Sequence, residues 1–520
     1  MPECESKTDQ ICPDPIFTIN TVKKILSELN PTKTPGVDDV HSYVLKMCAE
    51  SIAIPLKLIF ESSYNSGIVP ELWKNANITA LFKKGNKLSA TNYRPISLTS
   101  IVCKCMEKII KSTIMEHMMK ENLIIDEQHG FVSNKSCVTN LLETLDLITH
   151  ALENGFNIDI GFYDFAKAFD SVPHERLKLK LSSYGIKEKL LDWISAFLSN
   201  RVQRVVLGEF TSEWSKVLSG VPQGSVLGPL LFVIYINDLL IRLINKGKLF
   251  ADDTKSINVI KTEEDCINMQ SDINKLVEWT EKWLVKFNSD KCKVMHIGKT
   301  NPKWKYSINH GSTTHELQET ILEKDLGILL SNDLKWCHQV DSAKNKASKV
   351  IGRIKHTFTY LDPYSVKKLY TSLVRPHLEY ANAIWNPYLK SDIESLEKVQ
   401  RRATKMFSLK NSSYENRLKI LNLTSLEDRR KRGDLIQLFK ITRGKDKVAW
   451  VKEQRKINSI TRGHNSRYER ELTKKSSHRF NFFVNRTVNN WNSLDQEIID
   501  SASVNAFKRS LDKKLFGVLK

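Results

Sequence analysis

Two neighbouring aspartates, Asp252 and Asp253, are the residues whose type and spacing point most directly to chemistry. They follow the apolar pair Leu249-Phe250 and precede Thr-Lys-Ser-Ile at 254–257, a pattern that predicts a β-hairpin with the acids at its tip. Adjacent carboxylates repel each other, so a nearby cation lowers the cost of ionising both. Hard oxygen ligands at this density suit Mg²⁺, with substrate phosphates completing the shell. For an isolated Asp-Asp pair, the ordinary alternative is an acidic turn.

A third carboxylate, Asp164, follows the strand-like run 158–163. Residues 171–175, Ser-Val-Pro-His-Glu, then carry the signals of a helix start. A strand-end acid beside a hairpin that bears two more acids is the layout of a two-metal site. There, cations activate an attacking oxygen and stabilise a leaving one during phosphoryl displacement. By itself, Asp164 is equally compatible with a residue that caps a turn.

A glycine- and proline-rich loop separates these acids along the chain. Residues 219–225 are Ser-Gly-Val-Pro-Gln-Gly-Ser, and close glycines allow a backbone to approach a ligand. Gln223 presents a side-chain amide from this loop. Ser225 is a suitable N-cap for an apolar helix that we expect over about 226–240. An ordinary loop and core helix explain the apolar residues but not the glycine–proline–glutamine string.

These motifs together resemble those of a known family. Phe-Tyr-Asp-Phe-Ala-Lys-Ala-Phe-Asp (162–170), Gly-Val-Pro-Gln-Gly-Ser-Val-Leu-Gly-Pro (220–229) and Phe-Ala-Asp-Asp (250–253) resemble the palm motifs of reverse transcriptases. Their form is that of non-LTR (LINE-type) retrotransposons, of the jockey-like and chicken-repeat-like groups. Several motifs in the same order are a stronger signal than a single glycine-rich string.

Further segments extend the resemblance along the chain. They are Thr-Pro-Gly-Val-Asp (34–38), Asn-Tyr-Arg-Pro-Ile-Ser-Leu (92–98), Glu-Gln-His-Gly-Phe (127–131), Trp-Asn-Ser-Leu (491–494) and Val-Asn-Ala-Phe-Lys (504–508). The resemblance implies an RNA-directed DNA polymerase, a nucleotidyltransferase that copies element RNA into DNA, normally by target-primed reverse transcription. It implies an element RNA template, a DNA primer or target DNA, and deoxynucleoside triphosphates as partners.

The resemblance also assigns catalytic and metal-binding residues. Asp164, Asp252 and Asp253, with the backbone carbonyl of Phe165, would hold two Mg²⁺ ions, with Mn²⁺ as an alternative. These ions would lower the pKa of the primer 3′-hydroxyl and neutralise charge on the triphosphate. Lys291, in Asn-Ser-Asp-Lys at 288–291, matches a lysine that protonates the pyrophosphate leaving group. A surface lysine without a role is the alternative for Lys291.

The substrate-binding residues are assigned in the same way. Arg94 and either Lys83 or Lys84 would contact the triphosphate, Arg through bidentate hydrogen bonds and Lys as a point charge. Phe169 stands where the family places a bulky side chain under the sugar, which excludes a ribose 2′-hydroxyl. Gln223 would reach a base or sugar. A basic turn at Lys83 and Lys84 and a core position for Phe169 are the alternatives.

The implied fold is α+β, a right-hand polymerase with fingers, a palm built on a small antiparallel sheet, and a helical thumb. We expect an N-terminal extension at 1–30, fingers at 31–150, the palm at 151–335, the thumb at 336–410 and a basic nucleic-acid-binding region at 411–520. In the thumb, Lys344, Lys346, Lys349, Arg353 and Lys355 recur at helical spacing.

Composition agrees with this picture. The 520 residues are 41% hydrophobic and 27% charged, which is ordinary for a globular protein. The net charge of +20 indicates a polyanionic partner. Residues 401–520 hold 29 Lys and Arg against 12 Asp and Glu, so most of the excess charge lies near the C-terminus. A well-solvated helical surface is the alternative explanation.

The nine cysteines include no Cys-x-x-Cys pair, which favours reduced thiols in an intracellular protein. We expect nuclear and cytoplasmic locations, because the sequence has no signal peptide and no membrane-spanning run. Elements of this family usually encode an endonuclease upstream, and we expect this chain to lack one and to rely on an endonuclease supplied in trans. Two alternatives remain open: a decayed or co-opted copy that binds nucleic acid without polymerising, and another reverse transcriptase type such as an intron maturase or a telomerase-like enzyme.

Overall fold

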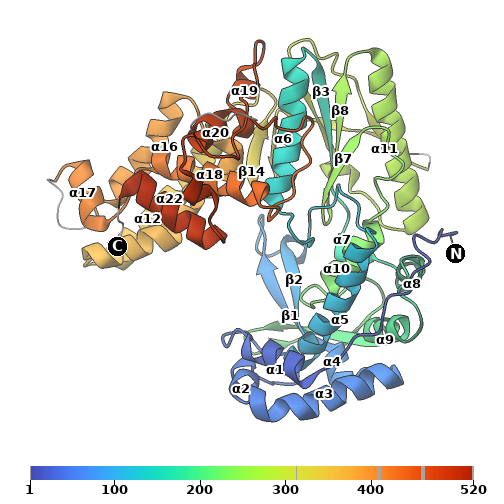
Figure 1. Cartoon of the computed structure of the whole chain (residues 1–520). Coiled ribbons are helices and arrows are strands. Elements are labelled where there is room, and N and C mark those ends of the chain that lie inside the picture. Colours follow the sequence, from blue (N-terminus) through green and yellow to red (C-terminus); the bar gives the residue numbers. More distant parts are fainter. Residues whose placement is uncertain (1, 312, 407–411, 458–462, 518–520) are drawn as a thin grey trace.

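The computed structural model describes residues 2–311, 313–406, 412–457 and 463–517 (Figure 1). The architecture is α+β, as predicted, with the acids on a central sheet that is antiparallel except for the parallel pair β12–β9. No helix in the described part of the chain is both long and apolar enough to cross a membrane.

The N-terminal part combines helices with a small sheet. Its helices are α1 (Ile19–Ser27), α2 (Ser42–Met47), α3 (Ala49–Ser66), α4 (Glu71–Lys74) and α5 (Ile101–Lys120). Its strands are β1 (Asn75–Phe82), β2 (Tyr93–Leu98), β4 (Arg201–Leu207), β5 (Phe210–Thr211) and β6 (Ser215–Val217). β1 pairs antiparallel with β2 and parallel with β4. The hairpin of β1 and β2 therefore carries the motif at 92–98 toward the central sheet (Figure 1).

The central sheet has the strand order β12-β9-β3-β8-β7. Its strands are β3 (Asn157–Tyr163), β7 (Lys246–Phe250), β8 (Asp253–Ile260), β9 (Lys293–Ile297) and β12 (Gln318–Glu319). Alternation along β3 places Ile158 and Ile160 in a core shared with helix α6 (Cys137–Glu153), as the two-residue period of a strand requires. Helix α11 (Glu263–Trp283) contacts β8. The acids thus stand on a sheet supported by packed helices.

Shorter elements connect the central sheet to its surroundings. They are α7 (Ala168–Ser171), α8 (His174–Ser183), α9 (Glu188–Leu198), α10 (Gly228–Ile236), β10 (Ser307–His310), β11 (Thr313–Glu316), β13 (Leu322–Asp325) and β14 (Ile328–Ser331). Helix α10 is shorter than the predicted 226–240. Pro229 stands in its first turn, which suits a helix start, and its C-cap Asn237 donates side-chain hydrogen bonds to Leu123 O and Tyr184 Oη. These tertiary contacts fix the chain in a new direction beyond Ile236.

The rest of the chain is mostly helical. Its elements are α12 (Cys337–Thr357), α13 (Pro363–Leu369), the π-helical turn Tyr370–Val374, α14 (Arg375–Glu379), α15 (Asn382–Trp385), α16 (Lys390–Ala403), α17 (Tyr414–Leu421), α18 (Leu426–Thr442), α19 (Ser477–Phe480), α20 (Phe483–Asn492), α21 (Gln496–Ile499) and α22 (Val504–Phe516). One hydrophobic core joins α6 and the sheet to α12, α16, α18, α20 and α22. The predicted junction near residue 410 lies outside the described residues, and the domain boundaries stay predictions.

Candidate active site

Asp164, Asp252 and Asp253 come together at one end of the central sheet. Asp164 follows directly on β3, whose last residue, Tyr163, pairs with Thr254 of β8. Asp253 opens β8 and pairs with Phe250, so Asp252 lies at the tip of the β7–β8 turn. We call this turn with its two strands the acidic hairpin. The register brings two elements that are far apart in sequence side by side, as the sequence predicted.

The electrostatics of these acids show repulsion that the protein does not cancel. Burial, followed by the charges of Asp252, Asp325 and Asp164, raises the pKa of Asp253 from 3.8 to about 6. Burial and then the charge of Asp164 also raise the pKa of Asp252, although Arg94 and Lys83 oppose the shift. Carboxylates that disfavour one another in this way are stabilised by a bound cation.

Lys291 contacts the first of these acids. Its Nζ lies 2.9 Å from Oδ2 of Asp164 and donates a hydrogen bond to it. The neighbouring Asn288 donates its backbone N–H to the carbonyl oxygen of Asp164 over 2.7 Å. Both side chains of the ion pair are partly exposed, so Lys291 and Asp164 lie at a surface that a ligand can reach.

A cavity of about 400 Å³ opens beside the acids, within the usual size range of small-molecule sites. Charged side chains dominate its lining, which includes Lys84, Asp164, Asp253, Lys255, Asp290, Lys291, Lys293, Glu323, Lys324 and Asp325. Asp325 is buried and forms an ion pair with Lys255. No local sequence pattern marks Asp325, because only the fold brings β13 against the acidic hairpin.

The basic residues predicted to hold a triphosphate lie on the β1–β2 hairpin. Lys83 and Lys84 follow β1, and Arg94 is on β2 opposite Leu81. All three basic side chains are exposed. Their charges reach the acids, since Arg94 and Lys83 both lower the pKa of Asp252. The structure therefore brings these cations to the same end of the sheet as the carboxylates.

Phe169 and Phe165 are both packed against other rings. Phe169 stacks on Phe232 of α10 with a centroid distance of 4.4 Å, yet it stays partly exposed. The buried Phe165 stacks on Phe287 at 4.6 Å. Ring packing at these two residues holds the segment that follows Asp164.

Gln223 is held by the turn that follows Asp164. Its Nε2 donates to Oδ1 of Asp170 over 2.8 Å, and its carbonyl accepts the N–H of Ser97 over 2.7 Å. Gly224 makes this approach possible, because its φ is +129° and a Cβ there would lie 2.3 Å from Ser97 O. The loop thus links β2 to the turn after Asp164, and contact of Gln223 with a substrate would require its amide to leave Asp170.

The oxygen donors at the acidic hairpin fit a hard divalent cation. Asp164, Asp252 and Asp253 supply carboxylates. The carbonyl of Phe165, the residue that follows Asp164, is a further oxygen donor. Within the described ranges, no three His, Cys, Asp or Glu side chains already form a closed metal cage. An open donor set of this kind is typical of Mg²⁺, which keeps waters and shares substrate phosphates.

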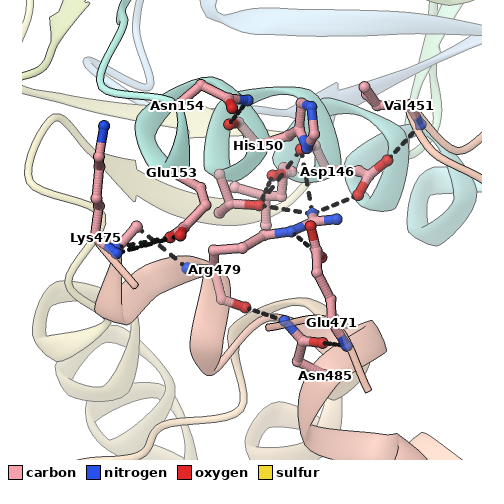
Figure 2. A network of polar contacts seen from close by, with 12 residues as sticks. Asp146, His150, Glu153, Asn154, Val451, Glu471, Lys475, Arg479 and Asn485 are labelled. Atoms are coloured by element: carbon pink, nitrogen blue, oxygen red, sulfur yellow. Dashed lines mark hydrogen bonds and ion pairs between the residues drawn. The ribbon is translucent and has the colours of Figure 1, made fainter. Parts of the chain in front are cut away.

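A second group of acids lies on α6 and binds the C-terminal region. Asp146 and Arg479 form an ion pair with an Oδ1–Nη1 distance of 2.6 Å, and both side chains are almost fully buried. Asp146 Oδ2 also accepts the N–H of Val451 over 2.6 Å. Arg479 Nε donates a hydrogen bond to Glu471 Oε2 over 2.7 Å. Figure 2 shows these groups pointing toward one another from α6 and from the C-terminal segment.

Two more acids on α6 contribute to this contact. Glu153 accepts the backbone N–H groups of Lys474, Lys475 and Ser476 (Figure 2). Glu143 accepts the N–H of Ala449 over 2.8 Å and is also ion-paired with Lys248 of β7. We call Glu143, Asp146, Glu153 and their partners the α6 network. No local sequence pattern marks this network, because its C-terminal partners are about 300 residues away from α6.

Comparison with known proteins supports the resemblance of the motifs. The profile of one family, described as reverse transcriptase (RNA-dependent DNA polymerase), matches residues 82–352. The RNA-directed DNA polymerase from mobile element jockey of Drosophila funebris is 27% identical over 414 residues, 76% of this chain and 44% of that protein. The probable RNA-directed DNA polymerase from transposon X-element of Drosophila melanogaster is 24% identical over 401 residues, 74% of this chain and 43% of that protein.

The chain therefore spans less than half the length of these two relatives. Among solved structures, apo telomerase from Candida tropicalis, truncated from its C-terminal domain, aligns with a TM-score of 0.34 at 12% identity, covering 54% of this chain and 59% of that chain.

Proposed function

The chain belongs to the reverse transcriptase (RNA-dependent DNA polymerase) family, and on that premise we propose that it is the RNA-directed DNA polymerase of a non-LTR retrotransposon. The observation that carries this proposal is the convergence of Asp164 with Asp252 and Asp253 in a site that raises the pKa of two of them. A protein that keeps such acids together without cancelling their repulsion is poised to bind divalent cations.

In this proposal, Asp164, Asp252 and Asp253, with the Phe165 carbonyl, would hold two Mg²⁺ ions. The bound ions would supply a lower pKa for the primer 3′-hydroxyl and charge neutralisation for the triphosphate. The 3′-hydroxyl passes its proton to water, its oxygen forms a bond to the α-phosphorus, and the bond between that phosphorus and pyrophosphate breaks. Lys291, next to Asp164, donates a proton to the departing pyrophosphate.

The fingers and the glycine-rich loop hold the incoming nucleotide. Lys83, Lys84 and Arg94 bind the triphosphate, since they are exposed cations near Asp252. Phe169 rests on Phe232 and blocks a 2′-hydroxyl, which favours deoxynucleotides. Gln223 contacts the base or sugar after it leaves Asp170.

The partners follow from this reaction. The enzyme takes element RNA as template and a DNA end as primer, normally at the target site, where an endonuclease makes the nick. It works in the nucleus and the cytoplasm, where target DNA and element RNA are found. The basic region at 411–520 adds affinity for nucleic acid.

Primer extension tests the proposal. The purified full chain, with an RNA template annealed to a DNA primer, deoxynucleotides and Mg²⁺, is expected to extend the primer. Asp252→Asn should lower the rate by at least about 100-fold, because a catalytic metal contributes several kcal/mol of transition-state stabilisation. Asp192→Asn, an exposed acid on α9, is the control and should extend normally. Binding of the template-primer without extension by the parent chain would contradict the proposal and indicate a co-opted binding protein.

A further inference from the structure

The motif at 127–131 has no role in the proposed chemistry, yet its residues lie along the edge of the acidic hairpin. Leu249 N donates to Glu127 O over 3.0 Å, and His129 N donates to Leu249 O over 2.9 Å. This is a parallel bridge between Gln128 and Leu249. The segment therefore extends the central sheet beyond its edge strand β7. The bridge lies at Leu249, close to the turn that carries the acids.

The side chain of Gln128 reaches that turn directly. Its Oε1 accepts the N–H of Ala251 over 3.1 Å and the N–H of Gly130 over 2.8 Å, and the residue is fully buried. Ala251 has a φ of +54° and stands immediately before Asp252. A residue with a side chain holds this conformation only where its surroundings stabilise it. The Gln128 amide is one such contact, and the peptide it holds sets the direction of Asp252.

Gly130 allows the segment to come this close. A Cβ on Gly130 would lie 2.4 Å from Ala251 N and 2.9 Å from Phe250 C, and backbone atoms of a paired strand have little room to shift. Any side chain at this position would therefore displace the turn.

The segment is itself anchored to α6. His129 Nδ1 lies 2.8 Å from the Thr139 hydroxyl, and its Nε2 lies 3.4 Å from Glu143. Glu143 also pairs with Lys248 on β7 and accepts the N–H of Ala449. Buried contacts from α6 therefore hold both the segment that carries Gln128, through His129, and strand β7, through Lys248.

We propose that Gln128 is a positioning residue that holds the Ala251–Asp252 peptide in the orientation the metal ligand needs. Gly130 provides the clearance. The inference rests on the proposed function, since it assigns Gln128 a part in the same reaction. A carboxylate displaced by about 1 Å can lower a rate on the order of 100-fold, so the contact matters for rate more than for substrate binding.

Hydrogen exchange at the Ala251 amide tests the contact without any reaction. Gln128→Met keeps the volume but removes the acceptor, and it should raise the exchange rate of this amide about tenfold, since removal of one hydrogen bond changes a local opening equilibrium by roughly that factor. Gln128→Glu keeps an acceptor oxygen and should preserve the protection. The control is Gln270→Met, which removes a matched carboxamide that accepts Ser307 N on another strand. Equal protection in the parent and Gln128→Met would overturn the proposal.

Primer extension then tests the consequence. Gln128→Met and Gly130→Ala should each lower kcat on the order of 100-fold, with the Kd for template-primer unchanged and with more Mg²⁺ needed for half-maximal rate. Gln128→Glu should recover most of the kcat that Gln128→Met loses, and Gln270→Met should match the parent.

The outcomes separate the two proposals. Parent-like kcat in both Gln128→Met and Gly130→Ala overturns the positioning role. A parent chain that does not extend primers at all contradicts the proposed function, and the exchange result still decides whether Gln128 holds the turn. If Gln128→Met fails to fold, Gly130→Ala tests the same displacement with the Gln128 acceptor in place.

Discussion

The acidic hairpin and helix α6 both carry a group of acids, but the two groups differ in what surrounds their oxygen atoms. Burial opposes the charge of Glu143, yet its contact with His129 and the charge of Lys248 outweigh burial and lower the pKa to about 2. Backbone N–H groups likewise lower the pKa of Glu153 despite some burial. Burial raises the pKa of Asp253 to about 6, and nearby acids reinforce it.

The difference indicates two uses of an acid. On α6, the carboxylates are surrounded by hydrogen-bond donors and by Arg479 from the C-terminal region and by Lys248 from β7, so these acids hold distant parts of the chain together. Asp146 shows the limit of that arrangement, since burial raises its pKa even with Arg479 beside it. At the acidic hairpin, neighbouring carboxylates raise the pKa of Asp252 and Asp253, and the charges of Arg94, Lys83 and Lys255 oppose them only in part. The first arrangement is complete within the protein, whereas the second becomes favourable when a cation binds.

Replacing one aspartate by asparagine in each group should give the largest difference in the free energy of unfolding. Asp146→Asn removes one of the two acids paired with the buried Arg479 and should lower the free energy of unfolding by about 3 kcal/mol. Asp252→Asn relieves repulsion and should leave stability equal or higher while removing polymerisation. Urea unfolding of the full chain, followed by far-UV circular dichroism, measures both.

The double variant Asp146→Asn with Arg479→Met is the control for this contrast. It should lose less than the sum of the two single variants, because the partners act on each other. Equal losses of stability in Asp146→Asn and Asp252→Asn would remove the distinction between the two groups.

Asp253 and Glu143 should change the stability of the protein in opposite directions as the pH rises. Asp253 titrates near 6 in the native state and near 3.8 when unfolded, so the native state holds the extra proton between these values. Its contribution to stability is therefore complete below about pH 4 and is lost as the pH rises to about 6. Glu143 should contribute above its ordinary value of 4.5 and lose this as the pH falls toward 2.

Thermal unfolding from pH 4 to 7, with and without Mg²⁺, measures this effect. Asp253→Asn should remove the part of the decline in Tm between pH 4 and 6 that ionisation of Asp253 causes. Mg²⁺ should raise the Tm of the parent at pH 7, where Asp253 is ionised, and should raise that of the variant less. A Tm that Mg²⁺ leaves unchanged in the parent would argue against cation binding at the hairpin.

The smallest expected effect concerns the basic C-terminal region. Several of its arginines pair internally, including Arg432, Arg479 and Arg486. Exposed lysines such as Lys452 and Lys456 are left to bind phosphates. Replacing both with Gln should make the log–log salt slope of template-primer binding shallower by about 0.9 for each phosphate that is no longer neutralised.

Lys24 and Lys189, exposed lysines elsewhere in the chain, provide the matched control pair. If the Lys24/Lys189 and Lys452/Lys456 double variants change the salt slope equally, the C-terminal charge has no special part in binding. Point substitutions are needed here because deletion of 401–520 would also remove Ala449, Val451 and Arg479 from the α6 network.

The sequence alone determined the chemistry and its local supports. The acids at 164, 252 and 253, the strand before Asp164 and the hairpin at 250–253 all follow from alternation and turn residues within a short stretch of chain. The motif order identified the family, which the profile match over 82–352 confirms. Roles for Phe169, Gln223 and Lys291 stay predictions, although the structure places Lys291 beside Asp164.

Only the tertiary structure decided what holds the acids in place. Gln128 lies 123 residues from Ala251, and Asp146 lies 333 residues from Arg479, so no local pattern links these partners. The same reason hid the link between the basic C-terminal region and α6, which composition alone presents as a separate charged segment. Hydrophobic periodicity and turn chemistry act over a few residues, whereas buried hydrogen bonds and ion pairs depend on which surfaces the fold brings together.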